Sequence, residues 1–204
     1  AIMRYKDRKL NTLEEIAKKD RENLYVREEP SFIKDLFIGR DAELKKLENI
    51  LESEVANVVV IQGISGVGKT WLASSFYYLV KGKLRDRVIY RRLSKFDEID
   101  DIVDYFLSFV KKPSHFSLKK ETSLDQKIRM LLSALNKKKH VIVLDDFHNI
   151  ENKTAFGILF FSKFIDNLEN SLLVLTTRTR PFSESRKIYE DKVIEIPLRG
   201  FNAD

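Results

Sequence analysis

Hydrophobic positions along the chain follow two alternating patterns. Short runs of consecutive apolar residues, such as VVVI at 58–61, VIVL at 141–144 and LLVL at 172–175, alternate with longer segments whose apolar residues recur at helical spacing. Continuous apolar runs are typical of strands that are buried on both faces, as in a parallel sheet covered by helices. The pattern therefore predicts an α/β fold, a three-layer sandwich in which a parallel five-stranded sheet carries helices on both faces.

The same pattern predicts the order of the elements. Each apolar run is followed by an amphipathic segment, so strands and helices alternate through most of the chain. Asp41 stands where it could cap the helix that follows. Predicted strands are 58–61, 87–93, 140–147, 171–178 and 192–198, and predicted helices are 12–26, 41–51, 98–110, 125–135, 155–169 and one that begins near Thr70.

Composition sets limits on the class of protein. The chain has 204 residues, 43% of them hydrophobic, which is enough for one sizeable core. Lys and Arg exceed Asp and Glu by 37 to 31, which is compatible with a nucleic-acid partner but does not indicate one, because the basic residues are spread along the chain. The chain contains no cysteine, which excludes disulfides, and its three histidines lack the spacing of zinc ligands. No apolar run is long enough to span a bilayer, so we expect no membrane partner and a cytoplasmic location.

One glycine-rich turn carries the strongest chemical signal. After the first strand, Gly63, Gly68, Lys69 and Thr70 match G-x-x-x-x-G-K-[ST], the phosphate-binding P-loop. The backbone of such a loop must wrap its N–H groups around phosphate oxygens, a shape that Cβ atoms would obstruct. A turn of this composition without a ligand is the alternative. The predicted nucleotide contacts in this stretch are Gly63, Ser65, Gly66, Val67, Gly68, Lys69, Thr70 and Trp71.

Two of these residues have roles that their chemistry predicts. A helix that starts near Lys69 would direct its unpaired N–H groups at the phosphates, and the lysine itself would place a positive charge at the β- and γ-phosphates. The hydroxyl of Thr70 would bind Mg²⁺. Trp71 follows directly and is close enough to report nucleotide binding by its fluorescence. The predicted cofactors are ATP or ADP with Mg²⁺.

A pair of carboxylates follows the apolar run at 141–144. Asp145 and Asp146 would lie at the carboxyl end of a buried strand, where ligands of open α/β sheets bind. We expect Asp145 to hold Mg²⁺ and Asp146 to orient or deprotonate the attacking water. The alternative is a solvated strand end with two turn-forming aspartates.

An arginine follows the apolar run at 172–175. That strand is expected to end in Thr176, Thr177 and Arg178, and a guanidinium suits a γ-phosphate oxygen. We expect Arg178 to contact that phosphate and to contribute to catalysis with Lys69 and Asp146. A surface arginine at a strand end is the alternative, and Arg180 is a weaker candidate.

Taken together, these motifs resemble the STAND signal-transduction ATPases, which include plant NB-ARC resistance proteins, apoptosome ATPases and the bacterial maltose-regulon activator. The resemblance covers about residues 32–201 and rests on FIGRDAEL, GISGVGKTWLA, VIVLDDFHNI, LLVLTTRTRPF and IEIPLRGF, in the order of that family. It implies a P-loop NTPase fold in which Phe37, Ile38 and Arg40 lie against the adenine. It also implies that Asp145 and Asp146 form the Walker B pair and that Arg178 is the sensor arginine.

The resemblance also implies a domain organisation and a working cycle. Members of that family continue into helical and winged-helix domains, so we expect residues 1–30 to form an N-terminal helical extension and 31–204 a nucleotide-binding domain that is truncated before those parts. ADP would hold a closed monomer, ATP would favour an open form that assembles into a homo-oligomer through the missing domains, and slow hydrolysis would reset it. Turnover of the domain alone should be low, because phosphoryl transfer often needs an arginine from a neighbour.

Two other functions share the P-loop. An archaeal AAA+ or replication-initiator-like ATPase would also carry the GR-x-x-E-L turn ahead of it and would associate with DNA. The Arg178 stretch speaks against this reading, because Asn or Thr is more usual there, and no DNA-binding helix is evident. A small-molecule kinase would need an arginine-rich lid, whereas the candidate lid at 111–123 has lysines and no arginine.

Overall fold

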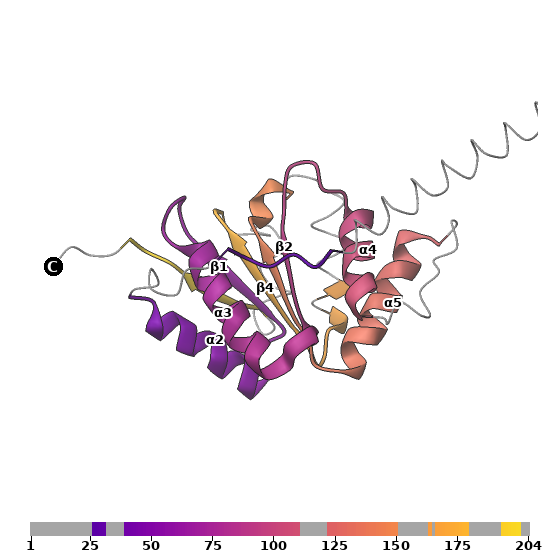
Figure 1. Ribbon diagram of the computed structural model, residues 1–204, viewed down its shortest axis with the longest axis horizontal. Coiled ribbons are helices and arrows are strands. Elements are labelled where there is room, and N and C mark those ends of the chain that lie inside the picture. Colours follow the sequence, from indigo (N-terminus) through magenta and orange to yellow (C-terminus); the bar gives the residue numbers. More distant parts are fainter. Residues whose placement is uncertain are drawn as a thin grey trace, which may run out of the picture.

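A computed structural model describes residues 26–31, 39–110, 122–150, 163–164, 166–179 and 193–200. Five strands form one sheet in the order β2-β3-β4-β1-β5, and every neighbouring pair is parallel (Figure 1). This confirms the predicted fold class. The strands are β1 (Val58–Gln62), β2 (Val88–Arg92), β3 (Val141–Asp145), β4 (Leu172–Thr177) and β5 (Val193–Pro197).

Helices cover the sheet in two pairs (Figure 1). The first pair is α2 (Asp41–Ser53) and α3 (Lys69–Leu84), and the second is α4 (Ile99–Val110) and α5 (Leu124–Lys137). Side chains of a strand alternate between faces, so Val59 and Ile61 of β1 pack with α2 and α3, whereas Val58 and Val60 pack with α4 and α5. The core therefore consists of two hydrophobic clusters, one on each face of the sheet, as the continuous apolar runs in the sequence predicted.

Helix starts differ in how their free N–H groups are satisfied. At α5, the hydroxyl of Ser123 accepts from the backbone of Gln126 in a capping box. At α2, the N-cap residue is Arg40 and no side chain caps the helix, so the predicted cap at Asp41 is wrong. Asp41 lies inside the first turn instead, where its charge interacts favourably with the helix dipole. The predicted helix at 12–26 falls almost entirely outside the described residues, as does most of the one at 155–169.

The edge strand β2 is covered by a segment from far upstream in the chain. Glu28 forms an antiparallel bridge with Tyr90, and the hydroxyl of Tyr105 accepts a hydrogen bond from the Glu28 N–H at 2.8 Å. The Tyr78 hydroxyl donates to the carbonyl of Pro30 at 2.9 Å. Covering an edge strand blocks pairing with another chain. Residues 27–30 thus contact β2 and the helices beside it, while a boundary at residue 30 stays a prediction.

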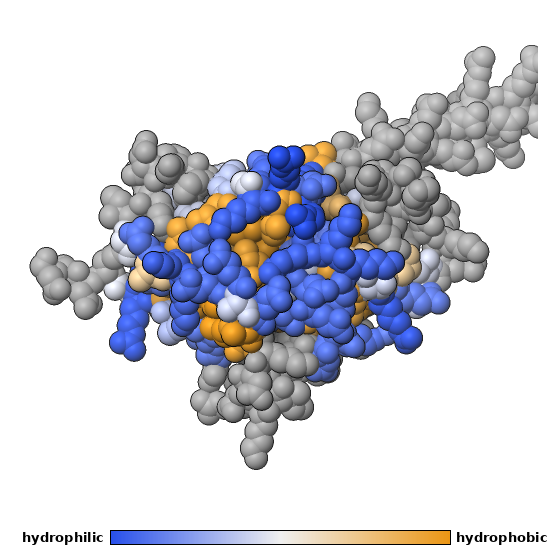
Figure 2. Space-filling view, turned by 90° about the horizontal axis from the view of Figure 1, so that it is seen from below, coloured by the Kyte–Doolittle hydropathy of each residue, from blue (hydrophilic) through white to orange (hydrophobic). Residues whose placement is uncertain are grey.

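One face of the molecule is shown in space-filling form in Figure 2, where hydrophilic side chains cover most of the surface and hydrophobic atoms show between them. Among the described residues, large hydrophobic side chains with high exposure are few: Val26, Val55, Ile64 and Phe96. Within this part of the chain, no helix is both long and apolar enough to cross a membrane.

Candidate nucleotide-binding site

The turn between β1 and α3 has the backbone shape that glycine permits. Gly66 and Gly68 adopt φ of 78° and 97°, in the left-handed region that side chains disfavour. At Gly63 the reason is space, because a Cβ there would lie 2.7 Å from Val67 Cγ1 and 2.8 Å from the carbonyl oxygen of Leu198. The glycines therefore allow both the curvature of the loop and its close packing against the chain that leaves β5.

Lys69 begins α3 and turns back over this loop. Its side chain is buried, and Nζ donates to the carbonyl of Ile64 at 2.8 Å. Burial lowers the pKa of Lys69, the nearby charge of Asp146 raises it, and that of Arg178 lowers it further. The ammonium group lies at the N-terminal end of the helix, where phosphate oxygens would be stronger partners than a single carbonyl.

Asp145 joins the P-loop to the end of β3. Its side chain is 0% exposed, and Oδ1 accepts hydrogen bonds from the hydroxyls of Thr70, at 3.1 Å, and Thr176. Oδ2 accepts from the hydroxyl of Tyr90 at 3.0 Å. Strand β3 lies between β2 and β4 in the sheet. The carboxylate of Asp145 at the end of β3 therefore contacts Tyr90 of β2 and Thr176 of β4 as well as Thr70 of α3.

The donors around Asp145 fit a magnesium site. All three are neutral hydroxyls, so they orient the buried carboxylate without cancelling its charge. Among the described residues, no three His, Cys, Asp or Glu side chains gather as an all-protein metal site. Mg²⁺ in nucleotide sites needs less, since it takes one or two carboxylates together with phosphate oxygens and waters. Thr70 and Asp145 are the residues that would hold it here.

Asp146 directly follows in a left-handed backbone conformation, with φ of 58°. Its N–H donates to Thr176 Oγ1 at 2.9 Å, which explains how this backbone is held. Its carboxylate pairs with Arg92, whose Nε donates to Oδ2 at 2.9 Å. The side chain lies at the same end of the sheet as Lys69, as predicted from the sequence pattern. Its role toward water stays a prediction.

The remaining P-loop residues and Arg178 take three kinds of position. Ser65 and Gly66 are exposed at the tip of the loop, Val67 packs into the core beneath it, and Trp71 is half-buried in the first turn of α3. Arg178 is exposed immediately after β4, and its charge is among those that lower the pKa of Lys69. Arg178 and Lys69 are thus at one end of the sheet.

Arg40 is a buried connector between segments. Its guanidinium donates to Glu43 Oε1 at 2.8 Å, to the P-loop carbonyl of Val67 at 3.1 Å and to the carbonyl of Arg199 at 2.6 Å. The contact with adenine that the resemblance implied stays a prediction for Arg40. The other two residues of that prediction, Phe37 and Ile38, lie outside the described residues.

Sequence motifs did not reveal the roles of Thr176, Tyr90 and Arg92. Thr176 stands at a predicted strand end, and its hydroxyl both accepts from Asp146 N–H and donates to Asp145. Tyr90 and Arg92 belong to β2, which carries no motif, and they reach Asp145 and Asp146 through the pairing of β2 with β3. The available signal was a tyrosine followed by two arginines in a predicted strand.

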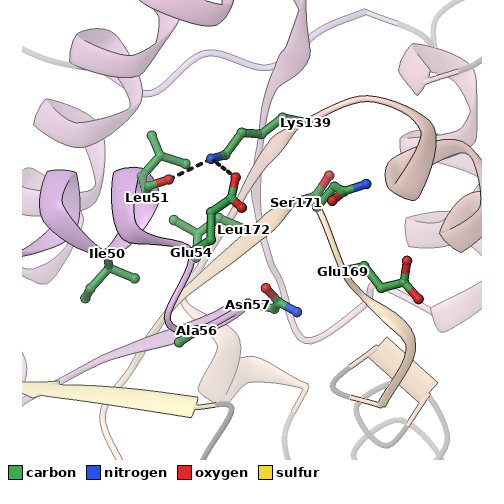
Figure 3. A pocket seen from close by; sticks show the side chains of 10 residues that line it. Ile50, Leu51, Glu54, Ala56, Asn57, Lys139, Glu169, Ser171 and Leu172 are labelled. Atoms are coloured by element: carbon green, nitrogen blue, oxygen red, sulfur yellow. Dashed lines mark hydrogen bonds and ion pairs between the residues drawn. The ribbon is translucent and has the colours of Figure 1, made fainter.

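A cavity at the opposite end of the sheet does not compete as a nucleotide site. It is lined by residues that precede β1, β3 and β4, among them Asn57, Lys139 and Ser171 (Figure 3). Its volume of about 10 Å³ accommodates roughly one water molecule. A nucleotide does not fit there.

Comparison with known proteins agrees with the geometry. A family model described as an ATPase domain predominantly from Archaea matches residues 37–179. The fold is similar to the ORC1 protein of Aeropyrum pernix in complex with DNA, at 19% identity and a TM-score of 0.64 over 84% of this chain and 48% of that one. It is also similar to Drosophila ORC bound to DNA, at 18% identity and a TM-score of 0.60 over 83% of this chain and 45% of that one.

A curated relative is an uncharacterized WD repeat-containing protein of Nostoc sp., 24% identical over 81% of this chain. The chain spans 14% of that protein and about half of the two similar structures. At these identities the structures establish the shared fold.

Proposed function

This chain belongs to the family of ATPase domains found predominantly in Archaea, and from that premise we propose that it binds ATP or ADP with Mg²⁺ at the P-loop and hydrolyses ATP slowly. The observation that carries the proposal is the contact of Thr70 with the buried carboxylate of Asp145, at 3.1 Å. The two residues are distant in sequence, and their meeting unites the phosphate-binding loop with the predicted magnesium ligand at one point.

The residues divide the chemistry among them. Backbone N–H groups of the P-loop and the first turn of α3 bind phosphate oxygens, and Lys69 exchanges its bond to Ile64 for the β- and γ-phosphates. Thr70 and Asp145 hold Mg²⁺, which neutralises charge on the phosphates when it is bound. Asp146 orients the attacking water, and Arg178 contacts the γ-phosphate. Low turnover is expected for the domain alone, because phosphoryl transfer often needs an arginine that a neighbouring protein molecule supplies.

For the cellular role, a DNA-associated, replication-initiator-like ATPase is the better supported candidate. Two proteins of similar fold, Aeropyrum pernix ORC1 and Drosophila ORC, are in complex with DNA in their structures. The objection from the sequence, that Arg178 stands where Asn or Thr is more usual in such ATPases, is unchanged. In the same strand, the hydroxyl of Thr176 donates to Asp145.

A STAND-type switch is the second candidate, and one observation favours it. The Nostoc relative is a WD repeat-containing protein of which this chain spans 14%, so a similar domain occurs within a much longer chain that carries repeats. In that setting the domain would report ADP or ATP to other parts of the chain and assemble into an oligomer when ATP is bound.

Nucleotide binding is tested first. ADP and ATP affinities are measured with Mg²⁺ by calorimetry and Trp71 fluorescence in the wild type, Lys69→Ala and Arg178→Ala. We expect Lys69→Ala to weaken both nucleotides and Arg178→Ala to weaken ATP alone, by about tenfold, because a guanidinium bond to a charged oxygen would be lost. If Arg178→Ala binds both ADP and ATP with the affinities of the wild type, Arg178 has no role at the γ-phosphate.

The cellular role is tested by DNA binding. Fluorescence anisotropy with labelled double-stranded DNA is recorded from 50 to about 200 mM salt, with and without ATP. The replication-initiator-like role predicts binding that weakens steeply with salt, because phosphate contacts release counterions. No binding at the lowest salt would leave the STAND-type switch as the better candidate.

A further inference from the structure

A tyrosine outside every nucleotide-binding motif contacts the predicted magnesium ligand. Tyr90 lies in the middle of β2, is 4% exposed, and donates its hydroxyl to Oδ2 of Asp145 at 3.0 Å. Val143, not Asp145, is its partner in the strand register, so its side chain extends along the sheet toward the carboxyl end to reach the carboxylate. The contact therefore depends on the length of a tyrosine and on its hydroxyl.

This contact helps to fix the plane of the carboxylate that meets the P-loop. Oδ1 accepts from Thr70 and Thr176, whereas Oδ2 accepts from Tyr90. A carboxylate side chain turns easily about its last bond unless both oxygens are held. With Tyr90 on Oδ2, Oδ1 stays directed at Thr70, the residue that would share a cation with it.

Tyr90 is itself held in position from three sides. Its carbonyl accepts from the hydroxyl of Tyr105 at 2.9 Å, and its backbone bridges to Glu28. Its ring packs edge-on against Tyr77 of α3, with 6.0 Å between centroids. Because the Tyr90 side chain is already fixed, it loses little conformational entropy when its hydroxyl orients the carboxylate of Asp145.

The phenol is a suitable donor for a carboxylate that must keep its charge. A phenol hydroxyl is uncharged at neutral pH, and Tyr90 donates it to Oδ2 of Asp145 at 3.0 Å. An arginine or lysine in the same place would neutralise the carboxylate and compete with a cation. A neutral donor orients the group and leaves its charge available.

We propose that Tyr90 is a positioning residue for magnesium-dependent nucleotide binding, acting through Asp145. The inference rests on the proposed function of Thr70 and Asp145 as magnesium ligands. It adds a residue of β2 to a site whose recognised parts belong to the P-loop and β3.

The test compares Tyr90→Phe with Tyr77→Phe as a matched control. Each change removes one hydroxyl from the same buried aromatic pair and keeps the ring, but Tyr77 is not a donor to Asp145. ADP affinity is measured by calorimetry in EDTA and in Mg²⁺, and the ratio of the two affinities is the readout. Thermal melting without nucleotide verifies that each variant is folded.

We expect Tyr90→Phe to reduce the Mg²⁺ enhancement of ADP affinity by roughly tenfold, the effect of one hydrogen bond to a charged group, and to leave affinity in EDTA within about twofold. Tyr77→Phe should keep the wild-type ratio. In an Asp145→Asn background, Tyr90→Phe should have no additional effect on the ratio, because the residue acts through that carboxylate.

Other outcomes separate the two ideas. A wild-type Mg²⁺ ratio in Tyr90→Phe overturns the role of Tyr90 and leaves the proposed function intact. An equal loss in Tyr77→Phe also overturns it, because general loosening of the aromatic pair would then be the cause. If the wild type itself binds ADP equally in EDTA and in Mg²⁺, the proposed magnesium site fails, and the role of Tyr90 fails with it.

Discussion

Lys69 and Lys139 lie at opposite ends of the same sheet, and their charges are balanced differently. Lys139 Nζ donates to the carbonyl of Leu51 at 2.7 Å and pairs with Glu54 at 2.8 Å (Figure 3). Lys69 is more deeply buried and donates to the carbonyl of Ile64, and among the described residues it forms no ion pair with a carboxylate. One lysine is already neutralised by its own chain, whereas the other has a charge that a ligand would satisfy better.

The surroundings of the two lysines follow the same division. At the amino end, Lys139 complements the carbonyls that end α2, and Glu54, whose pKa it lowers by a hydrogen bond, completes the pair. At the carboxyl end, Asp145 is buried among neutral donors and the glycine loop adopts left-handed backbone conformations. Polar groups that satisfy one another indicate a structural role, and polar groups that keep their charge indicate a binding site.

Among the variants that test this difference between the two ends of the sheet, the largest effect is expected from a change at Asp146. Asp146→Asn should lower single-turnover ATP hydrolysis by about 10²–10⁴-fold, because the carboxylate that orients or deprotonates water is lost. ATP affinity should change little. The control is Glu54→Gln at the amino end, which should hydrolyse ATP at the wild-type rate. Hydrolysis by Asp146→Asn within tenfold of wild type would exclude its proposed role.

The lysines themselves give the next largest effect. Lys69→Ala should weaken ATP about 10- to 100-fold in calorimetry, the effect of losing hydrogen bonds to charged oxygens. Lys139→Ala should bind ATP like the wild type and lose less than about 1 kcal/mol in the free energy of unfolding, as for a solvent-accessible ion pair. If both variants weaken ATP equally, the division between the two ends of the sheet is wrong.

A pair of glycine substitutions tests the backbone of the carboxyl end. Gly63→Ala should lower the free energy of unfolding by about 1–3 kcal/mol, because the new Cβ overlaps Val67 and Leu198. A Cβ on Gly82, inside α3, would meet no atom within 4 Å, so Gly82→Ala should raise it by about 0.5–1 kcal/mol. Urea denaturation measures both. A Gly63→Ala variant as stable as the wild type would show that the loop has room to shift.

The smallest effect is a pH dependence at the amino end. Burial lowers the pKa of His140, so the folded state binds fewer protons than the unfolded state between that lowered pKa and about 6.5. The free energy of unfolding should therefore fall as the pH drops below 6.5, by at most about 1.4 kcal/mol for each unit of pKa difference.

Urea denaturation at pH 7.5 and pH 5.5 measures the contribution of His140. The decrease in stability between the two pH values should be smaller in His140→Gln than in the wild type. An identical decrease in both proteins would assign the acid sensitivity to other groups.

The chemistry of a motif could be predicted from the sequence where it depends on residues that are close together along the chain. The P-loop spacing of Gly63, Gly68, Lys69 and Thr70 predicted a phosphate loop, and the apolar run before Asp145 predicted a carboxylate at a strand end. Local backbone sterics and hydrophobic periodicity suffice for such predictions, because both act over a few residues. The cap at Asp41 failed because Asp41 is already the first residue of the helix and Arg40 takes the N-cap position.

The sequence by itself determined the parallel α/β fold, and it predicted the phosphate loop and the end of the sheet at which the proposed site lies. Tertiary structure decided that β4 lies between β1 and β3, which brings Thr176 to Asp145, and that β2 pairs with β3, which brings Tyr90 to the other oxygen of the same carboxylate. Strand order is set by packing across the whole sheet, and no local pattern encodes it. Contacts that depend on strand order are therefore visible only once the strands are assembled.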